Sequence, residues 1–155
     1  MTESKHNTHG TGILVGDHGI LLTGVSGAGK SLLALDLLEQ ARLRGETALL
    51  ISDDRVLLSS DEDGLVMEAP PTIAGMIELR GRGIITLPHA KQAHVHLVVD
   101  LVEDEDRLLE ESQLSIKMHG IFVPRCPVPR RGRIDGLHQR FLVHAALRAL
   151  GAKLG

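Results

Sequence analysis

Short apolar runs separated by turn residues fill the first two thirds of the chain. Two pairs of these runs are joined by short polar segments that contain glycine, an arrangement typical of β-hairpins. The paired runs are residues 13–15 with 20–22 and residues 56–58 with 65–67. Residues 47–51 are continuously apolar and end in Ser52-Asp53-Asp54-Arg55. This pattern predicts a buried strand whose carboxyl end opens on a site. Residues 94–101 predict another strand.

Two segments have the length and the end signals of helices. The first covers about residues 31–44 and ends at Gly45, which suits a C-terminal cap. The second covers about residues 137–150, after a proline- and arginine-rich segment at residues 124–133 that we expect to be a loop. Strands outnumber helices, and hairpins join most of them. The sequence therefore predicts an α/β fold with a mixed, hairpin-rich sheet rather than a regular alternation of strand and helix.

The segment between the first hairpin and the first helix carries the most specific motif. Residues 24–31 read G-V-S-G-A-G-K-S and match the phosphate-binding loop (P-loop) pattern G-x-x-x-x-G-K-[ST]. In such a loop, backbone N–H groups surround phosphate oxygens at the N-terminus of the helix. We expect Lys30 to contact the β- and γ-phosphates of a nucleoside triphosphate and the Ser31 hydroxyl to bind Mg²⁺. The predicted nucleotide-binding residues are Gly24, Val25, Ser26, Gly27, Ala28, Gly29, Lys30 and Ser31.

Composition narrows the classes of partner. The net charge of −3 gives no general attraction to nucleic acids, and a chain with two Phe, no Tyr and no Trp lacks the aromatic platforms that bind single strands. The single cysteine, Cys126, excludes an internal disulfide and fits a reducing compartment. No apolar run is long enough to span a membrane. We therefore expect a cytoplasmic protein of 155 residues, with a flexible tail at residues 1–8 and one domain over residues 9–150.

Acidic residues at two places are candidates for chemistry beside the P-loop. Asp53 and Asp54 follow the strand after the first helix, where one carboxylate is suited to act as a general base and the other to hold a metal ion or an arginine. Neighbouring side chains on an extended backbone point to opposite sides, so we expect different roles for the two. Glu78 and Arg80 share one face of an extended segment and suit Mg²⁺ and phosphate, with a surface ion pair as the alternative.

Positive charge concentrates near residue 130. A rigid loop rich in arginine suits an anionic partner or a phosphate group, and a solvated turn is the alternative. The arginines of this segment are Arg125, Arg130, Arg131 and Arg133. The acidic run at residues 103–106 is typical of a solvated face, and Arg107 stands out as a cation beside it.

Taken together, these motifs resemble the catalytic domain of HPr kinase/phosphorylase, the bacterial enzyme that phosphorylates a serine of the phosphocarrier protein HPr. The resemblance covers about residues 6–146. Its motifs are His9-Gly10, fifteen residues before the P-loop; the P-loop itself, similar to G-x-S-G-x-G-K-S; Asp53-Asp54-Arg55-Val56, matching D-D-R-V; Ala69-Pro70-Pro71 with residues 77–85, similar to P-P and E-I-R-G-x-G-I-I; Asp106-Arg107-Leu108, matching D-R-L; and Gly132-Arg133.

The resemblance implies a fold similar to the nucleotide domain of phosphoenolpyruvate carboxykinase and an ATP- and Mg²⁺-dependent serine kinase of HPr or an HPr-like phosphocarrier. It also implies phosphate-dependent dephosphorylation of phosphoserine-HPr, a role in regulating the phosphotransferase system and carbon metabolism, and a homo-oligomer, hexameric in this family. The implied site residues are Lys30 on the phosphates, Ser31 and Glu78 on Mg²⁺, His9 and Arg107 in the active site, and Asp54, with Asp53 beside it, as the base.

The chain departs from the family pattern at several positions. Only a short tail precedes His9, where the long form of the family has an N-terminal domain. The first helix starts Ser-Leu-Leu at residues 31–33 where the family usually has Ser-Glu-Thr, and residues 128–133 read V-P-R-R-G-R where it favours P-V-K-V-G-R. Two other functions stay open: a P-loop kinase of a small metabolite, and a nucleotide-sensing module without catalysis.

Overall fold

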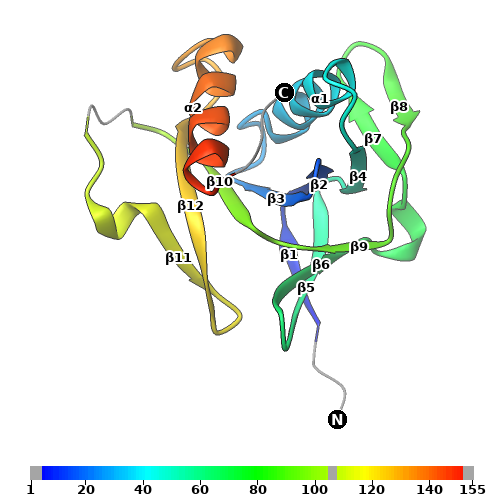
Figure 1. The fold of residues 1–155 in the computed structure, drawn as a ribbon. Coiled ribbons are helices and arrows are strands. Elements are labelled where there is room, and N and C mark those ends of the chain that lie inside the picture. The colour runs from blue at the N-terminus through cyan, green and yellow to red at the C-terminus, as the bar shows by residue number, and fades with distance from the viewer. Residues whose placement is uncertain (1–4, 105–107, 152–155) are drawn as a thin grey trace.

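Three layers make up the fold, with a central mixed sheet between a pair of helices and a smaller antiparallel sheet (Figure 1). The computed structural model describes residues 5–104 and 108–151. The strands are β1 (His6–His9), β2 (Thr11–Val15), β3 (His18–Thr23), β4 (Ala48–Ser52), β5 (Arg55–Asp61), β6 (Gly64–Glu68), β7 (Met76–Leu79), β8 (Gly83–Thr86), β9 (Gln92–His94), β10 (Leu97–Val102), β11 (Ser115–Met118) and β12 (Ile121–Pro129). The helices are α1 (Lys30–Leu43) and α2 (Gly136–Ala149), with short 3₁₀ turns at Pro71–Ile73 and Glu111–Leu114.

The central sheet mixes parallel and antiparallel pairs, which confirms the predicted fold class. Its strand order is β11-β12-β10-β3-β2-β4. β10 runs parallel to both of its neighbours, β3 and β12, whereas β2 runs antiparallel to β3 and β4. The expected hairpins at residues 13–22 and 56–67 are present as β2–β3 and β5–β6. Because β3, β10 and β12 are parallel, the segments that follow them leave the sheet at the same edge.

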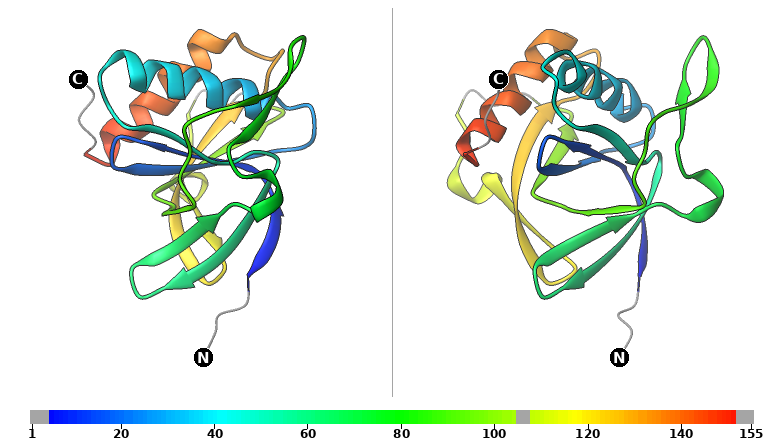
Figure 2. Two further views of the ribbon diagram at one scale, coloured as in Figure 1. Left: turned by 90° about the vertical axis from the view of Figure 1, so that its right-hand side faces the viewer. Right: turned by 45° about the vertical axis from the view of Figure 1, so that its right-hand side comes forward.

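Alternation of side chains along the central strands accounts for the three layers. Ile20 and Leu22 of β3, with Val99 of β10, belong to the core beneath the two helices. Leu21 and Val98, one position away on the same strands, belong to the core against the smaller sheet. Since successive residues of a strand point to opposite faces, these strands are buried on both sides. Figure 2 shows the helices on one side of the sheet and the β5–β6 hairpin on the other.

The smaller sheet has the order β1-β5-β6-β9 and is antiparallel throughout. β1 pairs with β5 from His6↔Leu58 to His9↔Arg55. Residues 6–8, assigned to a flexible tail from their polarity, are thus part of a strand, because backbone pairing with β5 needs no apolar side chain. The predicted strand at residues 94–101 is also divided: β9 ends at His94, and β10 begins at Leu97.

The segment predicted as a proline- and arginine-rich loop is mostly strand. Residues 124–129 belong to β12, and the N–H of the next residue, Arg130, donates to the carbonyl oxygen of Val102 in β10 (2.7 Å). The backbone N–H positions alternate between the two sides of a strand, so the backbone nitrogens at positions 127 and 129 face away from β10. Pro127 and Pro129 therefore remove no hydrogen bond to β10. The loop prediction was wrong because two prolines that lie two positions apart can both fit a strand.

The two helices pack together on the same face of the central sheet. Arg140 of α2 donates to both carboxylate oxygens of Asp36 in α1, each at 2.9 Å. The side chain of Asp135 caps α2 by accepting the N–H of His138 at 2.9 Å. Both helices have 14 residues, and among the described residues no helix has the length and apolarity needed to cross a membrane.

Candidate active site

The P-loop connects β3 to α1 and follows the curled path that its glycines permit. Gly24, Gly27 and Gly29 have φ angles of 146°, 83° and 95°, a region that strains any residue with a side chain. α1 begins at Lys30, directly after Gly29. The first N–H groups of a helix have no partner within the helix, and the helix dipole makes this end positive. The P-loop therefore presents the backbone donors expected of a phosphate site.

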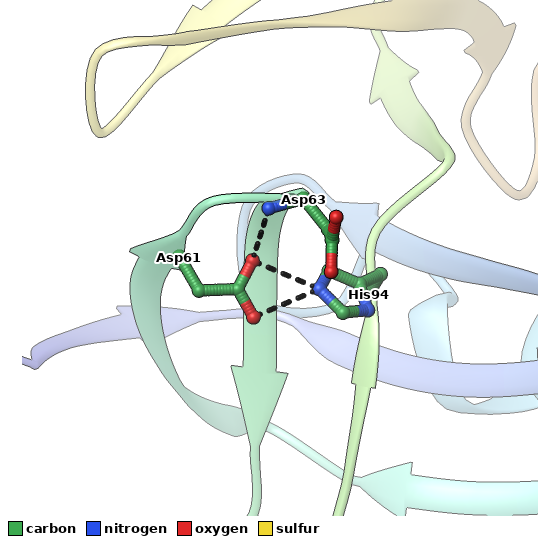
Figure 3. Close-up of side chains that lie close together, drawn as sticks. All are labelled: Asp61, Asp63 and His94. Carbon is green, nitrogen blue, oxygen red and sulfur yellow. Dashed lines mark hydrogen bonds and ion pairs between the residues drawn. The ribbon is translucent and has the colours of Figure 1, made fainter.

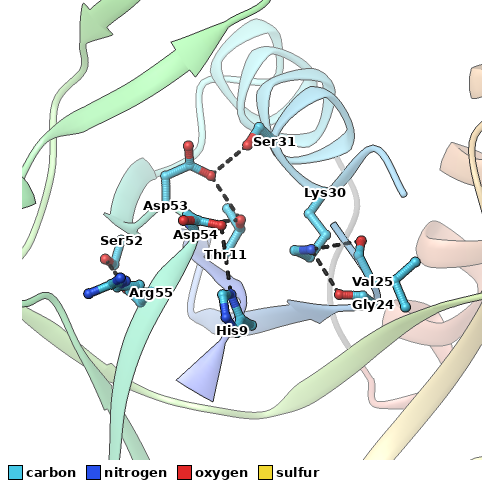
Figure 4. Close-up of polar contacts among 10 residues, drawn as sticks. All are labelled: His9, Thr11, Gly24, Val25, Lys30, Ser31, Ser52, Asp53, Asp54 and Arg55. Atoms are coloured by element: carbon cyan, nitrogen blue, oxygen red, sulfur yellow. Dashed lines mark hydrogen bonds and ion pairs between the residues drawn. The ribbon is translucent and has the colours of Figure 1, made fainter. Parts of the chain in front are cut away.

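Lys30 lies folded over the P-loop (Figure 4). Its ammonium donates to the carbonyl oxygens of Gly24 (2.8 Å) and Val25 (3.1 Å), and the residue is 8% exposed. An ammonium group has three donors, so one remains available after these two bonds. The charge of Lys30 is thus held inside the P-loop, close to the backbone that would surround a phosphate group.

Asp53 joins three elements through its carboxylate, and Figure 4 shows two of its contacts, with Ser31 and Thr11. Its Oδ1 accepts the hydroxyl of Ser31 at 2.6 Å and the hydroxyl of Thr11 at 2.9 Å. Its Oδ2 accepts the backbone N–H of Glu78 at 3.3 Å. With three donors and 8% exposure, Asp53 is fixed in place, and it in turn fixes the Ser31 hydroxyl at the start of α1.

Asp54 differs from its neighbour in exposure. It lies in the turn between β4 and β5 with a φ of 70°, and its side chain is 70% exposed. Its Oδ1 is 3.9 Å from Nδ1 of His9, at the end of β1. The sequence predicted that Asp53 and Asp54 would face different surroundings, and they do. The cause is this turn rather than an extended backbone.

A cavity of about 490 Å³ brings many of the predicted residues together. Lys30 and Ser31 line it beside Asp53 and Asp54, and Glu78 and Arg80 contribute from β7 and the turn after it. The segment of Glu78 and Arg80 was expected to be extended throughout. Instead the chain turns at Arg80, between β7 and β8, so the two residues reach the cavity from a hairpin and not from one strand face.

The oxygen atoms in this cavity suit a magnesium ion. Mg²⁺ prefers hard oxygen ligands, usually one or two carboxylates with waters and phosphate oxygens. The Ser31 hydroxyl and the Asp53 carboxylate are in contact, and Glu78 lines the same cavity. The donor set is therefore of the right chemistry for Mg²⁺ beside a bound phosphate chain.

Not every predicted residue is placed in this cavity. Arg107 lies outside the described residues. Three P-loop residues do not line the cavity: Gly24, Val25, which is 66% exposed, and Ala28, which is fully buried. His9 reaches the site only through its approach to Asp54.

Two residues near the P-loop were not singled out by their sequence. Thr11, fully buried, donates to Asp53 and accepts the N–H of Asp54 at 3.4 Å. Arg131, one of several arginines in its segment, lines the cavity beside Gly29. The sequence offered one indication for Thr11, because it directly follows the His9-Gly10 motif. Arg131 had no signal that separated it from the arginines around it.

A second cluster of ionisable groups lies at the tip of the β5–β6 hairpin (Figure 3). His94 Nε2 is 3.0 Å from both carboxylate oxygens of Asp61, and the bond to His94 is the main reason that the pKa of Asp61 is lowered. Asp61 Oδ1 also accepts the N–H groups of Asp63 (2.8 Å) and Gly64 (3.1 Å). Asp61 thus caps a tight turn and pairs with a histidine, and these bonds account for the cluster without a metal ion.

A loop of the pattern G-x-x-x-x-G-K-[ST] that leads from a strand into a helix is typical of the class of proteins that bind nucleoside triphosphates. Comparison with protein families identifies the branch of that class. Residues 2–146 match the model of the HPr Serine kinase C-terminal domain, and the chain belongs to this family.

Individual relatives agree with this assignment. An HPr kinase/phosphorylase from Geobacillus thermodenitrificans is 38% identical over 140 residues, and one from Clostridium acetobutylicum is 35% identical over 135 residues. Each alignment covers 79% of this chain and 42% of the relative, so the chain spans less than half the length of these relatives. The solved structure of the Hpr(Ser) kinase/phosphatase from Coxiella burnetii is similar with a TM-score of 0.73 and 28% identity, covering 94% of this chain and 93% of that one.

Proposed function

We propose that this chain is an ATP- and Mg²⁺-dependent kinase that phosphorylates a serine of HPr or an HPr-like phosphocarrier protein. The observation that carries the proposal is the exposed carboxylate of Asp54 at a cavity lined by Lys30 and Ser31, in a chain of the HPr Serine kinase family. The names of the relatives indicate the acceptor and suggest that the reverse, phosphate-dependent dephosphorylation belongs to the same site. A role in regulating the phosphotransferase system and carbon metabolism follows from such an acceptor.

Binding would use the P-loop as the structure presents it. The backbone N–H groups of the P-loop take the β- and γ-phosphate oxygens of ATP, and the Lys30 ammonium moves from the carbonyls of Gly24 and Val25 to these oxygens. Ser31 and Glu78 would hold Mg²⁺, with Asp53 beside them. A bound Mg²⁺ neutralises charge on the phosphate oxygens.

Transfer needs a base at the acceptor hydroxyl. Asp54 is suited to this role because its carboxylate is exposed, whereas that of Asp53 is occupied by three hydrogen bonds. Asp54 takes the proton as the serine oxygen bonds to the γ-phosphorus and the bond from the γ-phosphorus to ADP breaks. In the reverse direction inorganic phosphate takes the phosphoryl group, forming pyrophosphate, and the proton returns to the serine oxygen. His9 lies beside Asp54, with Nδ1 3.9 Å from Oδ1, and Arg107 is the expected cation for the transferred group.

The test is phosphorylation of HPr by the purified chain. Wild-type protein is incubated with ATP, Mg²⁺ and HPr, and the intact mass of HPr is followed with time. We expect HPr to gain one phosphoryl group. Asp54→Asn should retain ATP binding and lose transfer, since asparagine tolerates the φ of 70° but accepts no proton. Asp17→Asn, an exposed change in the β2–β3 turn, serves as the matched control and should leave the rate unchanged.

Two results would contradict the proposal. If the wild-type chain binds ATP and transfers nothing to HPr, the chain acts as a nucleotide sensor, or as a kinase of a small metabolite if it phosphorylates one. If Asp54→Asn transfers at the wild-type rate, Asp54 is not the base.

Three further expectations belong to the same proposal. A homo-oligomer, hexameric by resemblance, is tested by light scattering of the purified protein. The cytoplasmic location is tested by fractionation of the cells that make it. The likeness to the nucleotide domain of phosphoenolpyruvate carboxykinase is tested by superposition of the P-loop and its flanking strand and helix.

A further inference from the structure

The arginines that follow β12 have different partners, although they are close neighbours in sequence. Arg130 Nε donates to Oε1 of Glu103 at 2.6 Å, and Arg133 Nη2 donates to Oε2 of the same residue at 3.4 Å. The hydrogen bond from Arg130 is the largest reason that the pKa of Glu103 lies below its usual value. A single carboxylate thus pairs with both Arg130 and Arg133.

Arg131, between them, does not pair with Glu103. Its guanidinium makes no hydrogen bond and no ion pair with any residue that the structure describes. Its backbone is nevertheless well fixed, because its N–H donates to the carbonyl oxygen of Ala28 in the P-loop at 3.1 Å. Arg131 is therefore a cation that is anchored by its main chain and has no side-chain partner among the described residues.

The stem of Arg131 lies directly on the P-loop. A Cβ placed on Gly29 would come within 2.9 Å of Cβ and 3.3 Å of Cδ of Arg131, so the absence of a side chain at Gly29 makes room for this stem. Gly29 is the residue directly before Lys30, the first residue of α1, so the stem of Arg131 lies at the start of this helix. With its methylenes packed on this glycine, Arg131 lines the same cavity as Lys30 and Ser31.

Arg131 also lines a second cavity with Asp36 and Glu39 of α1, and both of these carboxylates are paired with other arginines. The first turn of α1 contains no acidic residue, and Leu32 stands where the family usually has a glutamate. A guanidinium recognises phosphate oxygens with two parallel N–H donors, which an ammonium does not provide. An arginine beside a phosphate-binding loop, with no partner in the described part of the chain, is thus suited to a phosphate group.

We propose that Arg131 is a second phosphate-binding cation of this site, acting beside Lys30. The proposal rests on the proposed function, since it takes the P-loop to bind a nucleoside triphosphate. It extends that function because it adds a second cation beside Lys30, at a position where the family pattern favours valine. The phosphate group that Arg131 binds has two sources, the phosphate chain of ATP and free inorganic phosphate, and the experiment separates them.

The test compares ligand binding by four variants with that of the wild type, measured by calorimetry without HPr. ATP is titrated in one series, and inorganic phosphate in the presence of ADP in another. Arg131→Gln keeps much of the stem and removes the charge, and Arg131→Val restores the family residue. Both should weaken the binding of ATP, of inorganic phosphate, or of both by tenfold or more. Arg131→Lys should recover part of the loss. Arg130→Gln is the matched control and should bind as the wild type does.

The outcomes distinguish a phosphate contact from packing on Gly29. A loss in the ATP series assigns Arg131 to the nucleotide, and a loss only in the phosphate series assigns it to the reverse reaction. Arg131→Gln binding both ligands within threefold of wild type overturns the proposal, even if Arg131→Val binds weakly, since packing alone then explains the valine variant. Equal weakening in Arg130→Gln also overturns it. If the wild type binds no ATP, the proposed function itself fails, and this inference fails with it.

Discussion

Removing the Thr11 hydroxyl tests whether the buried link to Asp53 holds the site together. Thr11→Val keeps the branched shape of the side chain and removes a fully buried donor 2.9 Å from Oδ1 of Asp53. A hydrogen bond to a charged group contributes about 1.5–3 kcal/mol to stability. Asp53 keeps the Ser31 hydroxyl and the Glu78 N–H as donors, which favours the lower part of that range. We expect Thr11→Val to lower the free energy of unfolding by about 2 kcal/mol.

The assay is urea unfolding followed by far-UV circular dichroism, because the chain has no Trp and no Tyr to report by fluorescence. With a denaturant dependence of about 2 kcal/mol per molar urea, the midpoint should fall by about 1 M. Thr86→Val, the same change at an exposed position in β8, is the control and should change stability by less than about 0.5 kcal/mol.

A double-mutant cycle assigns the loss to Asp53. If Thr11 acts through the carboxylate, its substitution should have a smaller effect in an Asp53→Asn background, by about 1 kcal/mol. The reasoning is refuted if Thr11→Val lowers the midpoint no more than Thr86→Val does. It is also refuted if the full loss persists in the Asp53→Asn background, since the hydroxyl would then act through some other group.

Two further predictions follow from titrating groups outside the site. The pKa of His96 is lowered, mainly by burial and then by His18 and His94, and its Nδ1 accepts the N–H of Gly19 at 2.9 Å. The stability that the neutral imidazole provides is full above about pH 6.5 and is lost as the pH falls below it. His96→Asn keeps a hydrogen-bond acceptor but does not titrate, so it should reduce the fall in the urea midpoint between about pH 7 and about pH 5. An equal fall in the variant and the wild type contradicts this. Burial raises the pKa of the Cys126 thiol to about 11. The folded protein should therefore resist a thiol reagent at about pH 8, whereas the unfolded protein should react at once. Fast labelling of the folded chain contradicts this.

The elements that sequence predicted well are those whose cause is local. The β2–β3 and β5–β6 hairpins follow from alternating apolar runs around short turns, and the end of α1 follows from Gly45. β12 was missed because its cause is not local. Proline and arginine are common in loops, and only the position of β10 beside Val128 and its neighbours shows which N–H groups of the segment are needed.

The same distinction applies to the candidate site. The P-loop and the Asp53-Asp54 pair were found because their residues are adjacent in sequence. Thr11 contacts Asp53 from 42 residues away in the chain, and its place near His9 in the sequence did not indicate this partner. Arg131 is distinguished from Arg130 only by the position of Glu103 and by the bare surface of Gly29, both of which require the folded structure.

The pairing of β10 with β3 has a consequence for how the protein folds. One side of β3 is completed by its hairpin partner β2, but the other side pairs with β10, from Leu97↔Ile20 to Asp100↔Thr23. The hydroxyl of Thr23, the residue before the P-loop, bonds to the carboxylate of Asp100, 77 residues later. Contacts between such distant residues form slowly, because a long loop must close first. During synthesis, one side of β3, the strand before the P-loop, therefore stays unpaired until β10 has emerged from the ribosome.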